Sequence, residues 1–382
     1  MDALTRAAAW QRARRILALR LDNLGDVLMT TPALRALRES APGRSVTLLA
    51  SRSGAAAIPH LPDIDDAIVA AMPWMPGAEP SADEVEDTVR QLRARRFDAA
   101  VIFTVYSQSP LPAAMLCWQA GIPLRLAHCR ENPYHLLTDW VEDPEPHEQL
   151  RHEVRRQLDL VATVGASCDD RRLSFRIHDA EAARARELLR AAGIDPGRPL
   201  IVVHPGASAP SRRYPEEHFA AVVARMLGFG ATAPDYQLVF TGDAGEAAVI
   251  DRIRALVGRP LPSLAGRLGL GELAAVIGSA ALLVANNTGP VHLAAAVGTP
   301  VVDIYALTNP QHAPWKVAHR VLYQDVPCRF CYRSVCPQGH HACLALLDPE
   351  RVAAAARELL ELGAERSTLP LPAIPLGECT AY

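Results

Sequence analysis

The chain has 382 residues, which is enough for two or at most three compact domains. Apolar residues make up 49% and charged residues 21%, and neither these fractions nor the 23 Gly and 31 Pro fit a disordered or collagen-like chain. The formal net charge of −3 leaves no surplus of cations to cover a polyphosphate backbone, so nucleic acid is not an expected partner.

The N-terminal segment gives no sign of targeting. Residues 1–15 contain four arginines and no uninterrupted apolar core, unlike a secretory signal peptide. The most apolar stretch, residues 273–285, is too short to span a bilayer. We therefore predict a cytoplasmic protein.

The first half of the chain alternates strand and helix patterns. Residues 16–21 and 99–103 are apolar runs of strand length, and residues 46–50 form a third. One helical pattern begins after the loop 22–26 and continues through Arg38, and a second covers residues 82–95. We expect Pro32 to kink the first helix or to mark its true start. This alternation predicts a parallel sheet covered on both faces.

The second half repeats the same alternation more clearly. We predict strands and helices in the order strand 200–204, helix 215–226, strand 237–241, helix 244–257, helix 271–279, strand 281–285, helix 290–297 and strand 301–306. The fold class is therefore α/β, with two Rossmann-like doubly wound domains that face a central cleft. We place the seam at residues 165–179 and predict domains 1–170 and 171–348, a helix 349–362 and an extended tail 363–382.

The first motif is RLDNLGDVLMTTPALRAL, residues 20–37. Gly25 allows a tight turn after the first strand, which leaves Asp26 at the carboxyl end of the sheet and at the start of a helix. A carboxylate in this place can act as a general base on a hydroxyl group. The alternative is that Asp26 is only the N-cap of the helix.

The second motif is VHPGASAPSRRYPEEHF, residues 203–219. A strand runs into a loop of small residues that carries Ser208, Arg212 and Arg213. Small residues let a ligand approach the backbone, and an arginine beside them can pair with a phosphate. A solvated pair of arginines on a surface loop is the alternative interpretation.

The third motif is VANNTGPVHLAAAVGTPVV, residues 284–302. Thr288 and Gly289 open a short helix whose unpaired N–H groups and positive dipole end form a diphosphate site without a metal. His292, in the first turn, either donates to a phosphate or sugar oxygen or is a structural histidine. No GxGxxG fingerprint or P-loop lysine occurs, which disfavours dehydrogenases and NTPases.

Two further segments carry candidate residues. In FTGDAGE, residues 240–246, Glu246 follows a strand and could accept hydrogen bonds from a ribose diol. The segment CRFCYRSVCPQGHHAC places four thiols within sixteen residues, at Cys328, Cys331, Cys336 and Cys343. Their spacing differs from common zinc motifs, so we expect a reduced structural cluster, and a closed tetrahedral zinc site is the alternative. A site with four thiolate ligands would have no open position for catalysis.

Together these segments resemble glycosyltransferase family nine, the ADP-heptose:lipopolysaccharide heptosyltransferases, over about residues 15–362. The signatures are GDVLMTTPALRAL, HPGAS with RRYPEEHF, NTGPVHLAAAVGTP and YALTNP. The resemblance implies a GT-B fold with the acceptor on the first domain and the nucleotide sugar on the second. It also implies that the final helix packs back toward the first domain.

The resemblance assigns roles to individual residues. Asp26 corresponds to the base that deprotonates the acceptor. Arg212, beside Arg213, stands where the family usually has a lysine that contacts the donor phosphates. Glu246 corresponds to the residue that contacts the ribose, and the phosphate-binding residues correspond to Thr288, Gly289 and His292. Asn287 is a departure, because an Asp that touches the donor sugar commonly precedes the TG pair.

The sequence and the resemblance together predict an inverting, metal-independent glycosyl transfer that requires no cofactor. The expected donor is ADP-heptose, and the acceptor is a lipopolysaccharide core or related glycan, with peripheral contact to the cytoplasmic face of the inner membrane. We expect the acceptor loops at residues 51–58 and 106–112. One alternative is a different nucleotide sugar, which Asn287 would permit. Another is a non-catalytic sugar-nucleotide-binding or metal-cluster protein.

Overall fold

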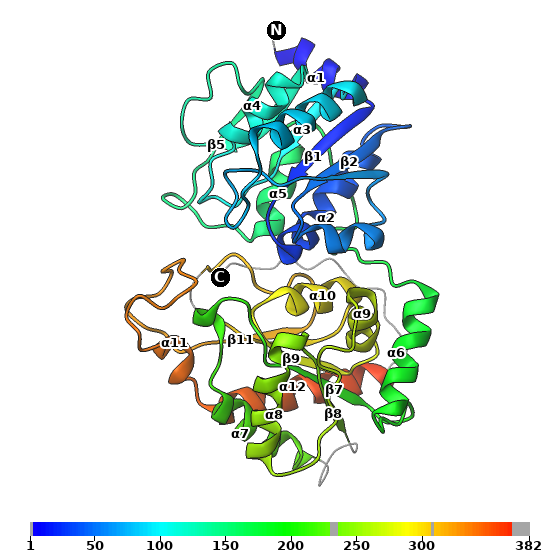
Figure 1. The fold of residues 1–382 in the computed structure, drawn as a ribbon, viewed down its shortest axis with the longest axis vertical. Helices are drawn as coiled ribbons and strands as arrows, with labels where there is room; N and C mark the ends of the chain where they lie inside the picture. Colours follow the sequence, from blue (N-terminus) through cyan, green and yellow to red (C-terminus); the bar gives the residue numbers. More distant parts are fainter. Residues whose placement is uncertain (1–2, 230–235, 307–308, 369–382) are drawn as a thin grey trace.

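The computed structural model describes residues 3–229, 236–306 and 309–368, which form two lobes, each built on one parallel sheet (Figure 1). The strands of the first sheet are β1 (Arg15–Arg20), β2 (Ser45–Ala50), β3 (Asp66–Val69), β4 (Ala99–Ile102), β5 (Leu124–Cys129) and β6 (Asp139–Glu142). Their order in space is β3-β2-β1-β4-β5-β6, the order of a dinucleotide-binding fold.

The second sheet is also fully parallel. Its strands are β7 (Leu200–His204), β8 (Gln237–Phe240), β9 (Leu282–Asn286), β10 (Val301–Ile304) and β11 (His319–Leu322), in the order β11-β10-β9-β7-β8. The predicted α/β class with two doubly wound units is confirmed. The sequence analysis missed β3, β5, β6 and β11, because charged or half-exposed positions interrupt the apolar runs of these strands.

Helices cover both faces of each sheet. They are α1 (Ala3–Arg12), α2 (Leu24–Glu39), η1 (Ala55–His60), α3 (Ala82–Arg95), α4 (Leu111–Gln119), α5 (Glu153–Ala162), α6 (Asp179–Ala191), η2 (Pro210–Arg212), α7 (Glu216–Met226), η4 (Ala244–Glu246), α8 (Ala247–Val257), α9 (Leu270–Gly278), α10 (Gly289–Val297), α11 (Ala342–Ala345) and α12 (Pro349–Thr368). Over the described ranges, no helix has both the length and the apolar character needed to cross a membrane.

One apolar cluster joins the two lobes. It includes Val27 and Leu28 of α2 together with Val291 and Leu293 of α10, all of them buried. Figure 1 shows α2 and α10 facing one another where the lobes meet. The strand order reverses between β1 and β4 in one sheet and between β7 and β9 in the other, and ligands of open α/β sheets bind outside the carboxyl ends of strands at such points.

Pro32 lies inside a continuous helix. The expectation that regular helix begins at Pro32 is wrong, because α2 starts at Leu24 and runs to Glu39. Proline has no N–H group to donate to the carbonyl four residues earlier, which is that of Leu28. The Thr31 hydroxyl donates to this carbonyl instead (2.7 Å), so the buried acceptor is satisfied.

The final helix differs from the expectation in place and in length. In the described residues, helix α12 packs most extensively against α7 and against β9, β10 and β11 of the second sheet, and it has no packing of comparable extent with the first domain. Its apolar residues, such as Val352 and Leu359, are buried in the cluster beneath α7 and α8. Because α12 continues to Thr368, the beginning of the predicted extended tail is helical, and residues 369–382 lie outside the described residues.

Candidate active site

The Asp26 carboxylate lies in the first turn of α2 and is held by two donors. The Asn23 backbone N–H donates to Asp26 Oδ2 (3.2 Å), and Arg20 Nη2 donates to Oδ1 (3.2 Å). His312 Nε2 lies 4.0 Å from the same Oδ1. The N-cap of α2 is Asn23, so the interpretation of Asp26 as the N-cap is wrong, although its carboxylate does cap the helix from the third position.

Arg20 is the charged centre of the first lobe. It is fully buried at the end of β1, and its guanidinium contacts three carboxylates, those of Asp22 (Nε to Oδ2, 3.0 Å), Glu153 (Nη1 to Oε1, 2.8 Å) and Asp26. Buried charges are tolerated only when they are paired in this way. The sequence analysis assigned no role to Arg20, Asp22 or Glu153. The only feature of the sequence that could have pointed to these residues is the charged pair Arg20 and Asp22 beside an apolar strand.

The charges around Asp26 keep it ionised. Burial raises the pKa of Asp26, but the Arg20 guanidinium, with smaller contributions from His312 and His292, outweighs burial, so that the pKa lies below its ordinary value. Asp22 differs, since its pKa is raised, first by burial and further by the nearby charge of Asp26. Two carboxylates on one guanidinium therefore have pKa values that are pushed apart, as in many acid–base sites.

Gly25 is required for a different reason from the predicted tight turn. Its backbone does not lie in the left-handed region, but a Cβ at this position would lie 2.7 Å from Cδ2 of His292 on α10. His292 is buried, its Nδ1 has no hydrogen-bond partner, and burial, with a smaller contribution from the neighbouring His312, lowers its pKa to about 3. The missing side chain at position 25 therefore lets the two lobes meet at a neutral imidazole.

Helix α10 presents its N-terminus to this junction. Thr288 is the N-cap and Gly289 the first helical residue, and a Cβ on Gly289 would lie 3.5 Å from Leu24 Cδ2 in the other lobe. The first N–H groups of a helix have no partner within the helix, and they carry its positive dipole end. The predicted anion-binding turn thus lies next to the loop that carries Asp26.

Asn287 is held inside the second lobe. Its Nδ2 donates to Asp303 Oδ2 and to the His312 carbonyl, both at 2.9 Å. Asp303 is fully buried and its Oδ1 has no partner, so burial raises its pKa well above the ordinary value. The family resemblance implied a carboxylate before the TG pair; Asn287 stands there, and the carboxyl group of Asp303 on β10 lies directly behind it.

The two arginines after β7 have different surroundings. Arg213 is exposed and folds back onto its own loop, where Nε donates to the Ala207 carbonyl (2.8 Å). Arg212 is half-buried, and its positive charge lowers the pKa values of both His292 and His312, which places it in electrostatic reach of the Asp26 junction. Ser208, earlier in the same loop, is exposed. Of these residues, Arg212 is the one whose charge acts on the histidines of the site.

Glu246 lies over glycines at the carboxyl ends of β7 and β8. A Cβ on Gly206 would collide with its carboxylate, which explains why the loop after β7 contains glycine there. The Asp243 N–H donates to Glu246 Oε2 (2.9 Å), and His204 Nε2 lies 3.6 Å from that oxygen. Burial raises the pKa of Glu246. The side chain is therefore fixed beside the small-residue loop, as a ribose-binding carboxylate would need to be.

A loop from the second lobe brings His312 to Asp26. The Gln311 carbonyl accepts from the Glu153 N–H (3.0 Å), and the Ala313 carbonyl lies 2.8 Å from His152 Nε2. These contacts attach the loop to the N-terminus of α5. The sequence analysis missed His312, because no motif surrounds it and its approach depends on a contact between segments about 160 residues apart.

The four cysteines line one small cavity, but in the described residues their sulfurs do not gather around one point. Cys328, Cys331, Cys336 and Cys343 share the cavity with His340 and His341, and Cys328 Sγ lies 4.0 Å from His340 Nε2. Within the described part of the chain, ligand atoms of three or more His, Cys, Asp or Glu residues come within 4.8 Å of one another only at His60, His178 and Glu181. Four thiolates bound to one zinc ion would lie closer together than these sulfurs do.

Comparisons with known proteins were made against families, sequences and structures. The model of a family described as glycosyltransferase family 9 (heptosyltransferase) matches residues 85–342. Lipopolysaccharide heptosyltransferase 2 of Escherichia coli K12 is 25% identical over 344 residues, covering 86% of this chain and 93% of that protein. A glycosyl transferase family 9 structure from Veillonella parvula has a TM-score of 0.75 at 23% identity and covers 94% of this chain and 99% of that one. The structure of E. coli ADP-heptose LPS heptosyltransferase II has a TM-score of 0.70 at 23% identity, with coverage of 92% and 99%.

Proposed function

This chain belongs to glycosyltransferase family 9, and from that premise we propose that it transfers a heptose from ADP-heptose to a hydroxyl of a lipopolysaccharide core or related glycan. The observation that carries the proposal is the junction of the two lobes. There the ionised Asp26 carboxylate lies beside the N-terminus of α10 and within electrostatic reach of Arg212. This arrangement supports a role for Asp26 as the base that activates the acceptor hydroxyl and for the α10 N-terminus as the anion site.

In the proposed reaction, Asp26 accepts the proton of an acceptor hydroxyl as its oxygen attacks the anomeric carbon. The bond from that carbon to the diphosphate oxygen breaks on the opposite face, so the configuration inverts. Negative charge grows on the leaving ADP, where the N–H groups of Thr288 and Gly289, the α10 dipole and Arg212 stabilise it. These groups support transfer without a metal ion.

The donor would lie across the second lobe. Glu246 would accept hydrogen bonds from the ribose, and His292 would border the diphosphate. Ser208 and Arg213 are proposed to flank the donor, although the Arg213 guanidinium also holds its own loop. Asn287 would contact the sugar, but its amide already donates to Asp303 and to the His312 carbonyl. This difference from the common Asp favours one second candidate, the same reaction with another nucleotide sugar.

Thermal unfolding in the presence of nucleotides tests the donor. A ligand that binds only the folded chain at about 100 times its Kd adds about 2.7 kcal/mol of stability, so ADP and ADP-heptose are expected to raise the melting temperature. UDP, GDP and CDP and their sugars are the comparison arms. If UDP but not ADP stabilises the chain, the donor is another nucleotide sugar and not ADP-heptose. Stabilisation without any product from an acceptor mixture would indicate a non-catalytic binding protein.

The pH dependence of transfer follows from the environment of Asp26. Its active form is the carboxylate, and a pKa below the ordinary aspartate value keeps that form present well into the acidic range. The nearby His292 and His312 have lowered pKa values and stay neutral at neutral pH. We expect kcat/KM to stay level as the pH falls from 7 through 6.5, without the inflexion of an ordinary histidine. A step near pH 6.5 would identify a histidine as the base instead.

Two further parts of the proposal concern the surroundings of the reaction. A lipid-linked acceptor would place the enzyme at the cytoplasmic face of the inner membrane through peripheral contact. We assign the cysteine segment a structural role outside the reaction, with or without bound zinc. The segment supports the loop after β7 that carries Arg212. The Ser211 hydroxyl of this loop donates to the Arg333 carbonyl (2.7 Å), and the Ser211 N–H donates to the Ser334 carbonyl (3.0 Å).

A further inference from the structure

Two histidines and one glutamate come together where the first lobe meets α6. A ring nitrogen of His60, a ring nitrogen of His178 and a carboxylate oxygen of Glu181 lie within 4.8 Å of one another. His60 is the last residue of η1 in the first lobe, whereas His178 precedes α6 and Glu181 lies in its first turn. Helix α6 packs on α9 of the second lobe, and Figure 1 shows it beside that lobe. The group therefore joins the two lobes, and the proposed transfer reaction uses none of its three members.

His60 is buried and held in one orientation. Its backbone carbonyl accepts from the Arg176 N–H (2.8 Å), and its Nδ1 lies 2.9 Å from the Arg176 carbonyl. Its ring stacks on that of Phe175, with 4.3 Å between the ring centroids. Because a carbonyl oxygen can only accept, the hydrogen of the neutral imidazole is on Nδ1, and Nε2 carries the lone pair. A backbone carbonyl that fixes the ring in this way is a usual partner of a metal-binding histidine.

Glu181 presents a carboxylate to that lone pair. Its Oε1 lies 3.7 Å from His60 Nε2, and its Oε2 accepts from the His178 backbone N–H (2.9 Å). A Cβ on Gly271, in the first turn of α9, would collide with this carboxylate, so the glycine makes room for it. The separation of 3.7 Å is too long for a hydrogen bond. It is close to the roughly 3.4 Å that separates two ligand atoms on one tetrahedral zinc ion.

His178 completes the group from an exposed position. Its Nε2 donates to the Pro59 carbonyl (3.0 Å), and its ring centroid lies 5.4 Å from that of His60. The carbonyl again fixes the hydrogen, so that Nδ1 of the neutral ring carries the lone pair. Because the His178 side chain is exposed, its ring can move the short distance that gathers the three ligand atoms around one ion.

The chemistry of the three groups selects the kind of ion. Two imidazole nitrogens and one carboxylate oxygen are a donor set typical of zinc and similar transition-metal ions. Magnesium and calcium ions prefer ligands that are all oxygen, so neither is expected at this place. The single negative charge of Glu181 and the two imidazoles suit a divalent cation that is bound in part through nitrogen.

We propose that His60, His178 and Glu181 bind one divalent transition-metal ion of the zinc type, with water in the fourth position, and that this ion fastens η1 of the first lobe to α6. The site goes beyond the proposed function, because the ion takes no part in the transfer reaction. It is also separate from the cysteine segment, which offers sulfur ligands.

Zinc binding by the full chain tests the proposal. The protein is kept reduced, stripped with a chelator and dialysed against a range of Zn²⁺ concentrations, and bound zinc is measured for the wild type, His178→Ala and Glu181→Gln. Any zinc that the four cysteines bind is common to all three samples. We expect one binding step of the wild-type curve to move to a roughly tenfold or higher Zn²⁺ concentration in each variant. Melting curves without metal check that the variants fold.

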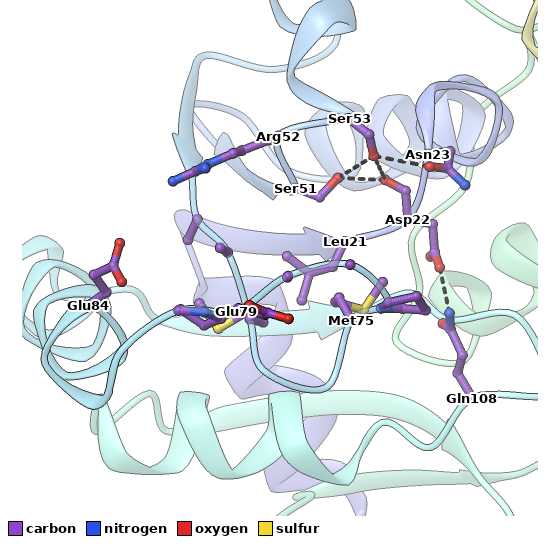
Figure 2. Close-up of a pocket in the computed structure, with 17 residues that line it drawn as sticks. Leu21, Asp22, Asn23, Ser51, Arg52, Ser53, Met75, Glu79, Glu84 and Gln108 are labelled. Atoms are coloured by element: carbon purple, nitrogen blue, oxygen red, sulfur yellow. Dashed lines mark hydrogen bonds between the residues drawn. The ribbon is translucent and has the colours of Figure 1, made fainter. Parts of the chain in front are cut away.

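Two control variants match these changes. Glu84 has the same place in α3 that Glu181 has in α6, since its Oε2 accepts from the backbone N–H of Ser81, the N-cap (2.8 Å). Figure 2 shows Glu84 on its helix at the edge of a cavity in the first lobe, outside the histidine group. His135→Ala removes an exposed histidine that is also outside the group. Glu84→Gln and His135→Ala are both expected to bind zinc as the wild type does.

Cobalt absorption identifies the ligands. Co²⁺ bound to thiolates gives a strong charge-transfer band in the near ultraviolet, whereas nitrogen and oxygen ligands give only the weaker visible bands. We expect the step that His178→Ala and Glu181→Gln shift to add visible bands without the thiolate band, and Zn²⁺ but not Mg²⁺ to raise the melting temperature of the wild type. Coincident zinc curves for the wild type and both variants, or cobalt bound to the wild type through thiolates alone, would overturn the proposal. No donor or acceptor is used, so these results are independent of the proposed function.

Discussion

Asp26→Asn is expected to lower kcat by roughly 10²- to 10⁴-fold, the usual contribution of a general base, while binding of ADP stays unchanged. The physical reason is that the amide has nearly the same shape as the carboxylate but cannot accept the acceptor's proton. Arg20 would still contact Asp22 and Glu153, so the buried guanidinium would remain paired. Initial rates with saturating donor give kcat, and thermal shift with ADP gives donor binding.

Asp83→Asn is the matched control for this variant. Asp83 is an exposed carboxylate in the first turn of α3, in the same lobe as Asp26 and one position nearer to the start of its helix. We expect transfer at the wild-type rate from this control. If Asp26→Asn also transferred at that rate, Asp26 would only cap α2, and the base would have to be sought elsewhere.

Arg212→Ala is expected to weaken donor binding and to reduce turnover by about two orders of magnitude, or ~3 kcal/mol, as for the loss of one preorganised donor to a developing anion. Arg212 is half-buried, and its charge acts on His292 and His312. Arg212→Lys retains the charge without the fork of donors and is expected to recover part of the rate. Donor KM and kcat separate binding from leaving-group stabilisation.

Arg252→Ala serves as the control for Arg212→Ala. Arg252 is an exposed arginine on α8 in the same lobe and pairs with Glu216 at 2.7 Å, so its loss removes one positive charge at a distance from the site. A rate loss of equal size in both variants would mean that the net charge of the lobe, and not Arg212 itself, stabilises the donor. A wild-type rate for Arg212→Ala would mean that the N-terminus of α10 stabilises the donor phosphates without Arg212.

Much of the fold could be predicted because its signals are local. Strands such as β1, β2 and β7 are buried on both faces, so they appear as short apolar runs, and the helical patterns between them imply parallel pairing. Strands at or near the sheet edges, such as β3, β6 and β11, are partly exposed and carry polar residues, so their composition does not distinguish them from loops.

The sequence by itself determined the alternation of strand and helix, the turn that opens α10, and the candidate residues Asp26 and Arg212, because each depends on neighbours within a few positions. Only the tertiary structure decided which groups surround them. Arg20 meets Glu153 across 133 positions, Gly25 is needed because His292 comes close, and His312 reaches Asp26 on a loop held by α5. Burial and long-range charge pairs set the protonation of such groups, and both arise only when distant segments pack together.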